Sequence, residues 1–180
     1  MGAVIKKENS AQESDHQQYL TFVLGGEMFA IGILCVKEII EYGNLTVVPM
    51  MPDCIRGVIN LRGAVVPVVD LASRFGRKQT QITRRTCIII IEAEKDGTQQ
   101  DMGITVDAVS EVLEIRRDQI EPPPSLGTKI RTDFIHGMGK LNDRFVIVLD
   151  VNKMLSMDDL AALSEAARAG MDSTVLEAAE

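Results

Sequence analysis

Residues 57–71 read GVINLRGAVVPVVDL, and this stretch decides the predicted fold. Two apolar runs, residues 58–61 and 64–69, lie on either side of the dipeptide Arg62-Gly63. Short β-rich runs separated by a turn dipeptide are typical of two antiparallel strands joined by a tight turn. The stretch therefore predicts a β-hairpin.

Two residues of the same stretch define how this hairpin continues. Pro67 has no N–H to donate to a neighbouring strand, so we expect a sheet edge or a bulge at this residue. Asp70 follows the second strand in the position of a helix N-cap. Residues 70–75 are therefore expected to form one or two turns of helix.

The same strand–turn–strand pattern recurs along the chain, which predicts a mainly β fold. The other expected strand pairs are residues 19–24 with 28–33, 86–93 with 100–106, and 134–141 with 144–149. Their expected connections are Gly25-Gly26, a loop containing Asp96-Gly97, and Asn142-Asp143. The expected helices are few: residues 70–75, residues 150–155 behind an Asp150 cap, and an amphipathic C-terminal helix over residues 157–169.

An internal repeat is visible when the chain is aligned with itself. At a first offset, Ile55, Gly57, Leu61, Val66, Val68 and Asp70 fall on Ile135, Gly137, Leu141, Val146, Val148 and Asp150 without a gap. At a second, slightly smaller offset, Ile31, Val36, Glu38 and Glu41 fall on Ile104, Val109, Glu111 and Glu114. We interpret this as a duplication into two small β-units. Because each unit has too little interior to be stable alone, the two should share a core.

Charge divides the chain into three parts. Residues 1–17 are polar and aperiodic, as expected of a disordered leader, and residues 18–155 form the body. Of the net charge of −7, residues 156–180 carry −5, so the body is nearly neutral and the tail is acidic. A body without a basic stripe and with few aromatic residues is not expected to bind nucleic acid.

The chain is expected to be cytoplasmic. Its longest apolar run, residues 87–91, is far too short for a membrane-spanning helix, and its start does not resemble a signal peptide. Three cysteines at positions 35, 54 and 87 match no metal-ligand spacing, and their odd number argues against a disulfide framework. We expect three free thiols and no direct insertion into a membrane.

No set of residues predicts catalysis, a metal site or a cofactor. His136 lies in a strand-like segment, and the cysteines that could pair with it have apolar neighbours that would raise a thiol pKa. Asp70 and Asp150 are explained as helix caps that the duplication places twice. Gly137 and Gly139 indicate a bulge or a barrel corner more than a ligand loop.

A binding surface is the remaining possibility. Residues 36–41, VKEIIE, place charged side chains beside Val and Ile that could be exposed. Arg62 is a long cation at a turn position that small residues normally occupy. Arg62 could be an ordinary solvated turn residue, or it could pair with an acid such as Glu38 and so fix two segments relative to each other.

Residues 57–71 resemble the CheW family of chemotaxis coupling proteins. The Asn-Leu-Arg-Gly turn, Pro67 and Asp70-Leu71 are the family's signature as it stands in this sequence. The resemblance continues through residues 22–41, 105–112 and 135–139 and covers about residues 18–155. It implies two intertwined five-stranded SH3-like β-barrels that share a core, with the switch between the halves near residues 80–85.

The resemblance also implies a function. Proteins of this family are non-enzymatic adaptors that link the cytoplasmic tips of methyl-accepting chemoreceptors to the regulatory domain of the histidine kinase CheA. An adaptor of this kind has no cofactor and is recruited to receptor arrays at the inner face of the membrane. A groove between the barrels would take a receptor helix, and a barrel end would pair with its counterpart on the kinase.

Positions that match the family are implied to bind these partners, with Glu38 and Arg62 as the expected ion pair. The implied partner-binding residues are Val36, Glu38, Gly57, Arg62, Gly63, Ile88, Val106, Val109 and Gly137. Two other classes of function stay open. A small-molecule binder would require an enclosed apolar cavity, and an enzyme would require a titratable cluster that the sequence does not show.

Overall fold

The computed structural model describes residues 15–95, 97–123 and 132–156. Most of the predicted leader and the predicted helix over residues 157–169 lie outside these ranges. The described strands are β1 (His16–Leu24), β2 (Glu27–Gly32), β3 (Val36–Glu41), β4 (Ile55–Leu61), β5 (Ala64–Asp70), β6 (Cys87–Lys95), β7 (Thr98–Val106), β8 (Ala108–Arg116), β9 (Ile120–Glu121), β10 (Ile135–Leu141) and β11 (Arg144–Leu149). The described helical segments are short: η1 (Ile33–Cys35), α2 (Leu71–Arg74), η2 (Arg117–Gln119), η3 (Thr132–Phe134) and α3 (Val151–Met154). The mainly β prediction is confirmed.

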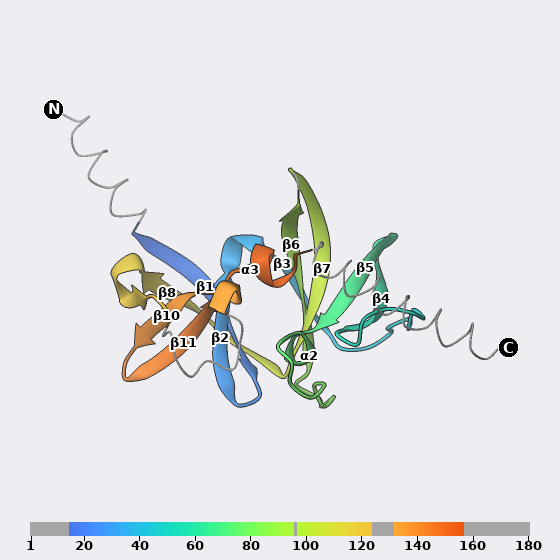
Figure 1. Ribbon diagram of the computed structural model, residues 1–180, viewed down its shortest axis with the longest axis horizontal. Helices are drawn as coiled ribbons and strands as arrows, with labels where there is room; N and C mark the ends of the chain where they lie inside the picture. The colour runs from blue at the N-terminus through green and yellow to red at the C-terminus, as the bar shows by residue number, and fades with distance from the viewer. Residues whose placement is uncertain (1–14, 96, 124–131, 157–180) are drawn as a thin grey trace, which may run out of the picture.

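The strands form two sheets that lie side by side (Figure 1). Barrel 1 is the five-stranded sheet in the order β3-β6-β7-β5-β4, and barrel 2 is the six-stranded sheet in the order β8-β1-β2-β11-β10-β9. Each barrel therefore takes strands from both halves of the chain. Barrel 1 combines β3, β4 and β5 with β6 and β7, whereas barrel 2 combines β1 and β2 with β8 to β11. The predicted intertwined architecture is confirmed, but barrel 2 has six strands where five were expected, because the two-residue β9 adds to its edge.

The duplication is visible in the strand register. Val68 in β5 pairs in parallel with Gly103 in β7, and Val148 in β11 pairs in parallel with Ala30 in β2. These two residue pairs correspond to each other in the internal repeat. The first offset relates Val68 to Val148, and the second offset relates Ala30 to Gly103. Each parallel pairing joins a strand of one half to a strand of the other. The two repeats have thus exchanged strands, which is the physical reason that neither barrel is a contiguous piece of chain.

The core has three parts, as the exchange of strands requires. Small clusters fill the barrels: Ile59, Val66, Val68, Ile88 and Ile90 in barrel 1, and Tyr19, Ala30, Ile115, Val146 and Val148 in barrel 2. A larger third cluster draws on both barrels, and its buried aromatic rings are Phe22, Phe29, Phe75 and Phe134. The aromatic rings form a chain with centroid separations of 5.7–6.2 Å. The prediction of a shared core is confirmed.

The predicted hairpins all form, and three of their turns have the backbone conformation that a two-residue hairpin requires. Gly25 and Gly26 have φ angles of 59° and 80°. Arg62 and Gly63 have φ angles of 54° and 87°, and Asn142 and Asp143 at the matching positions have 40° and 66°. Positive φ at both central residues matches the right-handed twist of the flanking strands. Arg62 adopts this conformation although it has a side chain, and its turn is held by a hydrogen bond from the Gly63 N–H to Asn60 Oδ1 (2.9 Å).

Pro67 lies in an interior strand, yet its missing N–H costs no hydrogen bond to β7. Strand β5 lies between β7 and β4, but β7 pairs only with Val68–Asp70. Pro67 precedes this pairing and is opposite Val58 of β4 alone. The expectation of an edge strand is therefore wrong for β5 as a whole, although Pro67 itself has a neighbouring strand on one side only.

Three features differ from the sequence-based expectation. The first strand begins at His16, within the predicted leader, because β1 pairs with β8 from the His16–Arg116 pair onward. Strands β3 and β8 were not expected as strands. Strand β3 alternates half-buried and exposed residues, and β8 is mostly exposed with only Ile115 fully buried, so both lack the continuous apolar run that marks the central strands.

Candidate functional site

An ion pair joins the two edges of barrel 1. Arg62 Nη2 lies 3.1 Å from Glu38 Oε2, and the side chains are 83% and 27% exposed respectively. Glu38 lies on β3 and Arg62 at the turn after β4, and these strands are the opposite edges of the sheet. The predicted Glu38–Arg62 pair is confirmed. Exposed pairs of this kind contribute about 0–1 kcal/mol to stability, so the main effect of the pair is to orient a solvent-exposed guanidinium.

Barrel 2 has no counterpart of this ion pair. Glu111 matches Glu38 in the repeat, but Asn142 matches Arg62 and carries no charge. Glu111 instead exchanges backbone hydrogen bonds with the Thr21 side chain: its N–H donates to Thr21 Oγ1 (3.1 Å), and the Thr21 hydroxyl donates to its carbonyl (2.7 Å). The two barrels share a backbone plan but present different chemistry at the matched turn.

Gly57 and Gly137 occupy matching bulges. The register of β4 against β5 shifts between Ile55 and Gly57, and that of β10 against β11 shifts between Ile135 and Gly137. A Cβ at Gly57 would collide with the Thr46 carbonyl, and a Cβ at Gly137 would collide with the Ile120 side chain and lie 2.9 Å from the Glu121 carbonyl oxygen. The bulge predicted at Gly137 is confirmed. Both residues are buried, so they shape the backbone of the site.

The remaining predicted residues divide by burial. Gly63 is exposed beside Arg62, and Val36 and Val109 are half-buried at matching positions, where both pack against the shared core. Ile88 and Val106 are fully buried, Ile88 inside barrel 1 and Val106 in the shared core. Neither Ile88 nor Val106 therefore has exposed atoms with which to contact a partner directly.

Sequence reasoning missed most of a second set of surface residues, of which only Ile39 lies in the segment 36–41 already singled out. Val65 and Phe145 match in the repeat and are 72% and 56% exposed, and Ile39 and Val112 are a second exposed matching pair. Exposed apolar side chains at equivalent positions of both barrels are a feature of interaction surfaces. The two offsets of the repeat were the available signal, but the strands that carry Ile39 and Val112 were not recognised from the sequence.

Lys37, on the opposite face of β3 from Glu38, forms a second set of ion pairs on barrel 1. Lys37 Nζ lies 2.8 Å from Asp101 Oδ1 and 4.0 Å from Glu92 Oε1. The hydrogen bond to Asp101 raises the pKa of the Lys37 ammonium above its ordinary value. Three adjacent strands, β3, β6 and β7, are therefore linked by side-chain charge as well as by their backbone ladders.

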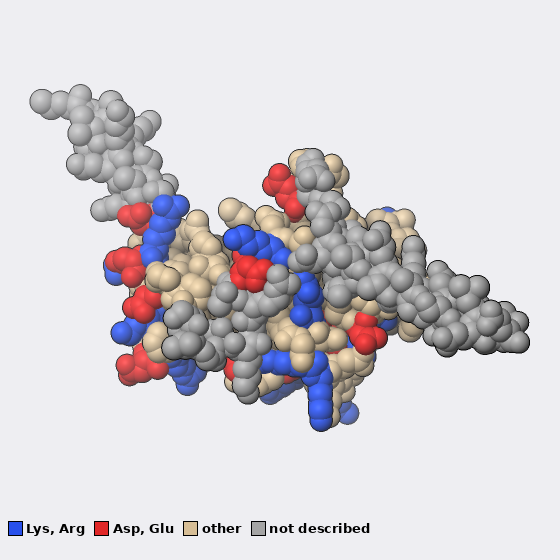
Figure 2. All heavy atoms as spheres, in the orientation of Figure 1, with Lys and Arg blue, Asp and Glu red and all other residues tan. Residues whose placement is uncertain are grey.

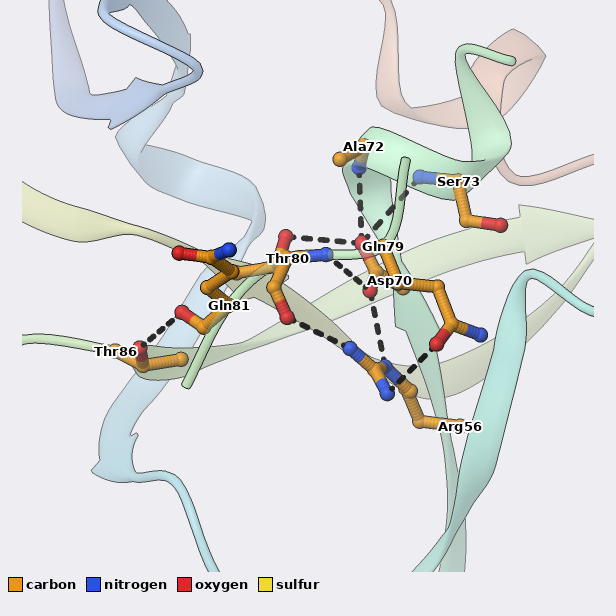
Figure 3. A network of polar contacts seen from close by, with 8 residues as sticks. All are labelled: Arg56, Asp70, Ala72, Ser73, Gln79, Thr80, Gln81 and Thr86. Carbon is orange, nitrogen blue, oxygen red and sulfur yellow. Dashed lines mark hydrogen bonds and ion pairs between the residues drawn. The ribbon is translucent and has the colours of Figure 1, made fainter. Parts of the chain in front are cut away.

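A buried polar network lies at the end of barrel 1 (Figure 3). The Asp70 carboxylate is fully buried, accepts N–H bonds from Ala72 (3.1 Å) and Ser73 (3.4 Å), and so caps α2. The same carboxylate pairs with Arg56 Nε (2.9 Å) and accepts bonds from the N–H and hydroxyl of Thr80 (2.9 and 3.0 Å). Asp150, at the matching position, caps α3 by accepting a bond from the Lys153 N–H (3.1 Å). The helix-cap prediction is confirmed for both aspartates.

His136 and the three cysteines lie on different segments of the described structure. His136 is exposed on β10, and the cysteines are free, with burial raising the pKa of the Cys35 and Cys54 thiols. In the described ranges, no group of three or more His, Cys, Asp or Glu side chains is arranged to hold a metal ion. The described helices also include none long and apolar enough to span a membrane.

The described surface includes an open hollow of 1080 Å³ where the start of β1 meets η1 and the end of β8, lined partly by His16, Leu34 and Arg117. The barrel interiors are filled by the clusters of apolar side chains described above. A small β-barrel that binds a ligand inside needs an interior that side chains leave empty. The structure therefore does not favour the small-molecule alternative.

The exchanged two-barrel fold and the CheW signature at the Arg62 hairpin define a class of protein. The sequence model of the CheW-like domain matches residues 18–159. The chain therefore belongs to the CheW-like domain family.

Individual relatives agree with this assignment. The chain is 36% identical over 158 residues to the chemotaxis protein CheW of Klebsiella aerogenes, covering 88% of this chain and 93% of the relative. It is 33% identical over 158 residues to chemotaxis protein CheW of Helicobacter pylori, covering 85% and 93%. Among solved structures, the scaffolding protein TtCheW from Thermoanaerobacter tengcongensis is similar with a TM-score of 0.70 and 35% identity, covering 79% of this chain and 89% of the other.

Proposed function

We propose that this protein is a non-enzymatic adaptor that couples the cytoplasmic tips of chemoreceptors to the histidine kinase CheA. Membership of the CheW-like family supports the class of function, because curated relatives of similar length are named chemotaxis protein CheW and a solved relative is titled a scaffolding protein. The protein acts in the cytoplasm and is recruited to receptor arrays at the inner face of the membrane.

The observation that carries the proposal is the exposed Arg62 held by Glu38 across the edges of barrel 1. An arginine 83% exposed at a hairpin tip contributes little to the core, so its orientation by a partner carboxylate serves recognition. Exposed Ile39 follows Glu38 in β3, and exposed Val65 lies three residues after Arg62 at the start of β5. Arginine is among the residues that are enriched at protein–protein interfaces and at their energetically important positions.

The two partners are proposed to use different parts of the molecule. A receptor helix occupies a groove between the barrels, where half-buried Val36 and Val109 lie at the border of the shared core. The kinase regulatory domain pairs with a barrel end. Gly57, Gly137, Ile88 and Val106 act indirectly, by holding the backbone and the packing on which these surfaces depend.

The test combines the purified chain with a chemoreceptor signalling fragment and CheA, and measures complex formation and kinase autophosphorylation. We expect a ternary complex and a changed rate of autophosphorylation with the unaltered chain. Arg62→Ala and Glu38→Ala are expected to fold, by circular dichroism, and to lose coupling. Asn142→Ala is the matched control, because it alters the equivalent turn of barrel 2 and leaves Arg62 unchanged. This variant should still couple the receptor fragment to the kinase. A folded chain that bound neither partner would refute the adaptor function.

A further inference from the structure

A strongly basic loop follows α2. Residues 77–85 read RKQTQITRR, with four cations and no acidic residue, in a body (residues 18–155) whose net charge is −1. Arg77 is paired, with Nη2 2.9 Å from Glu27 Oε2. Lys78, Arg84 and Arg85 are exposed, and none of them pairs with an acidic side chain among the residues that the structure describes. This basic loop, residues 77–85, leaves three cations without a described counter-charge.

The basic loop borders an open surface. Arg77, Lys78 and Arg85 line a hollow of 520 Å³, whose lining also includes Gly25 and one acidic residue, Asp107. Basic side chains gather around the lower end of α2 in the space-filling view (Figure 2). Ile82, within the loop, is exposed although it is a large apolar residue. The loop thus offers positive charge and an apolar contact on one surface.

The chain itself contains a segment of complementary chemistry. Residues 157–180 carry six acidic side chains and one basic one. Apolar residues Met157, Leu160 and Leu163 recur within this segment at three-residue spacing. The segment combines the two properties that would match the basic loop, negative charge and an apolar stripe.

The position where this segment leaves the described fold makes the contact feasible. The carbonyl of Met154, at the end of α3, accepts a hydrogen bond from Arg74 Nε of α2 (3.0 Å). The basic loop begins only three residues after Arg74, where the Arg77 N–H donates to the Ala72 carbonyl (2.9 Å). Since an extended chain spans about 3.3 Å per residue, a segment of this length reaches the whole loop from Ser156.

We propose that the acidic C-terminal segment, residues 157–180, docks on the basic loop of its own chain. The contact is held by charge and by apolar atoms placed over Ile82, and it covers the cations of the basic loop. Because attraction between exposed charges is screened over about 10 Å at 0.1 M salt and about 3 Å at 1 M, the docking is strong at low ionic strength and weak at high ionic strength.

The test uses the full chain and zero-length carbodiimide cross-linking, which joins an amine to a carboxylate in direct contact. Lys78 is the only lysine in the basic loop, so its cross-links report on this surface. We expect cross-links between Lys78 and acidic residues of the segment in low salt, and their loss in 0.5 M NaCl. Lys78→Arg keeps the charge and removes the amine, so the same peptides should disappear from that variant.

A second variant tests the segment. It neutralises the six carboxylates by Asp158→Asn, Asp159→Asn, Glu165→Gln, Asp172→Asn, Glu177→Gln and Glu180→Gln. We expect trypsin to cleave after Arg84 and Arg85 several-fold faster in this variant than in the unaltered chain at low salt, and equally fast in 0.5 M NaCl. Cleavage at equal rates at low salt would overturn the proposal.

Two further outcomes would also overturn it. One is a set of Lys78 cross-links that reach only carboxylates of the folded body, such as Glu27 or Asp107. The other appears when equal amounts of chains with normal and heavy nitrogen are mixed: if about half of the Lys78 cross-links to the segment join a light peptide to a heavy one, as random pairing of two chains gives, the segment binds a second copy and not its own chain.

Discussion

The guanidinium of Arg62 and the carboxylate of Glu38 join two strands that are the opposite edges of barrel 1. The 3.1 Å contact spans 24 positions in the sequence and has no charged equivalent in barrel 2, where Asn142 replaces the arginine. A duplicated fold has therefore kept its backbone in both copies and its charge pair in only one. This asymmetry marks barrel 1 as the candidate site for charge-dependent recognition.

Arg62→Ala is expected to change the free energy of unfolding by less than about 1 kcal/mol from the ion pair, because both charges reach solvent. Coupling between receptor and kinase is expected to fall sharply. Chemical denaturation and the reconstituted kinase assay measure these two quantities separately. A variant that fails to fold would show that Arg62 is a structural residue.

Exchanging the charges tests the pair itself. Glu38→Arg combined with Arg62→Glu keeps an ion pair between the two edges of barrel 1. It reverses the sign of the charge that a partner protein would contact at each position. If the pair only fixes the geometry of the two edges, the double variant should recover coupling that each single variant loses. If the exposed guanidinium contacts the partner, as we propose, coupling should remain lost, and the kinase assay distinguishes the two results.

Gly57→Ala is expected to destabilise the protein by about 2 kcal/mol or more. Its Cβ would meet the Thr46 backbone, with the carbonyl carbon only 3.0 Å away, at a φ of 154° that side chains rarely adopt. Gly63→Ala is the matched control, since its φ is 87° but no atom lies within 4 Å of the added Cβ. The control should cost about 1–2 kcal/mol for the left-handed backbone alone. Equal unfolding midpoints would contradict a steric role for Gly57.

Asp70→Ala and Asp150→Ala compare two helix caps that differ in their surroundings. Removing Asp150 should cost about 1 kcal/mol, the usual value of an N-cap. Removing Asp70 should cost about 3–5 kcal/mol, because Arg56 then loses the fully buried partner of its ion pair. Urea unfolding of both variants measures the difference. Similar losses would mean that the network around Asp70 adds nothing to its capping bonds.

The thiol of Cys35 should ionise only at unusually high pH. Burial raises its pKa above the ordinary value of 9.0, and its Sγ–H donates to the Gly32 carbonyl (2.9 Å). Alkylation by iodoacetamide, mapped by mass spectrometry, should therefore show a pH midpoint above 9.0 in the folded chain and near 9.0 in urea. A folded-state midpoint below 9.0 would contradict the structure.

The same pKa shift has a consequence for stability. Above pH 9.0 the Cys35 thiol of the unfolded chain loses its proton while the folded chain still holds it. The unfolded state then binds fewer protons, so the free energy of unfolding falls as the pH rises through this window. Cys35→Ser should flatten this part of the pH dependence, which denaturation at a series of pH values can measure.

Local features of the fold were predictable from the sequence because their causes are local. The Arg62-Gly63 and Asn142-Asp143 turns follow from turn residues between apolar runs, and the Asp70 and Asp150 caps follow from the position of each aspartate after a strand. The internal repeat, read from two offsets of the chain against itself, predicted a shared core. Strands β3 and β8 were missed, because an edge strand that buries only part of one face has no clear apolar pattern.

The sequence by itself determined the hairpins, the helix caps and the two-fold repetition, since each depends on residues within a few positions of one another or on a pattern that recurs in order along the chain. Only the tertiary structure decided that β2 pairs with β11 and β5 with β7, so that the repeats exchange strands. It also decided that Arg56 joins Asp70 in a buried network while His136, at the matching position, is exposed. Pairing between distant strands depends on how whole faces pack, and no local pattern of residues specifies that choice.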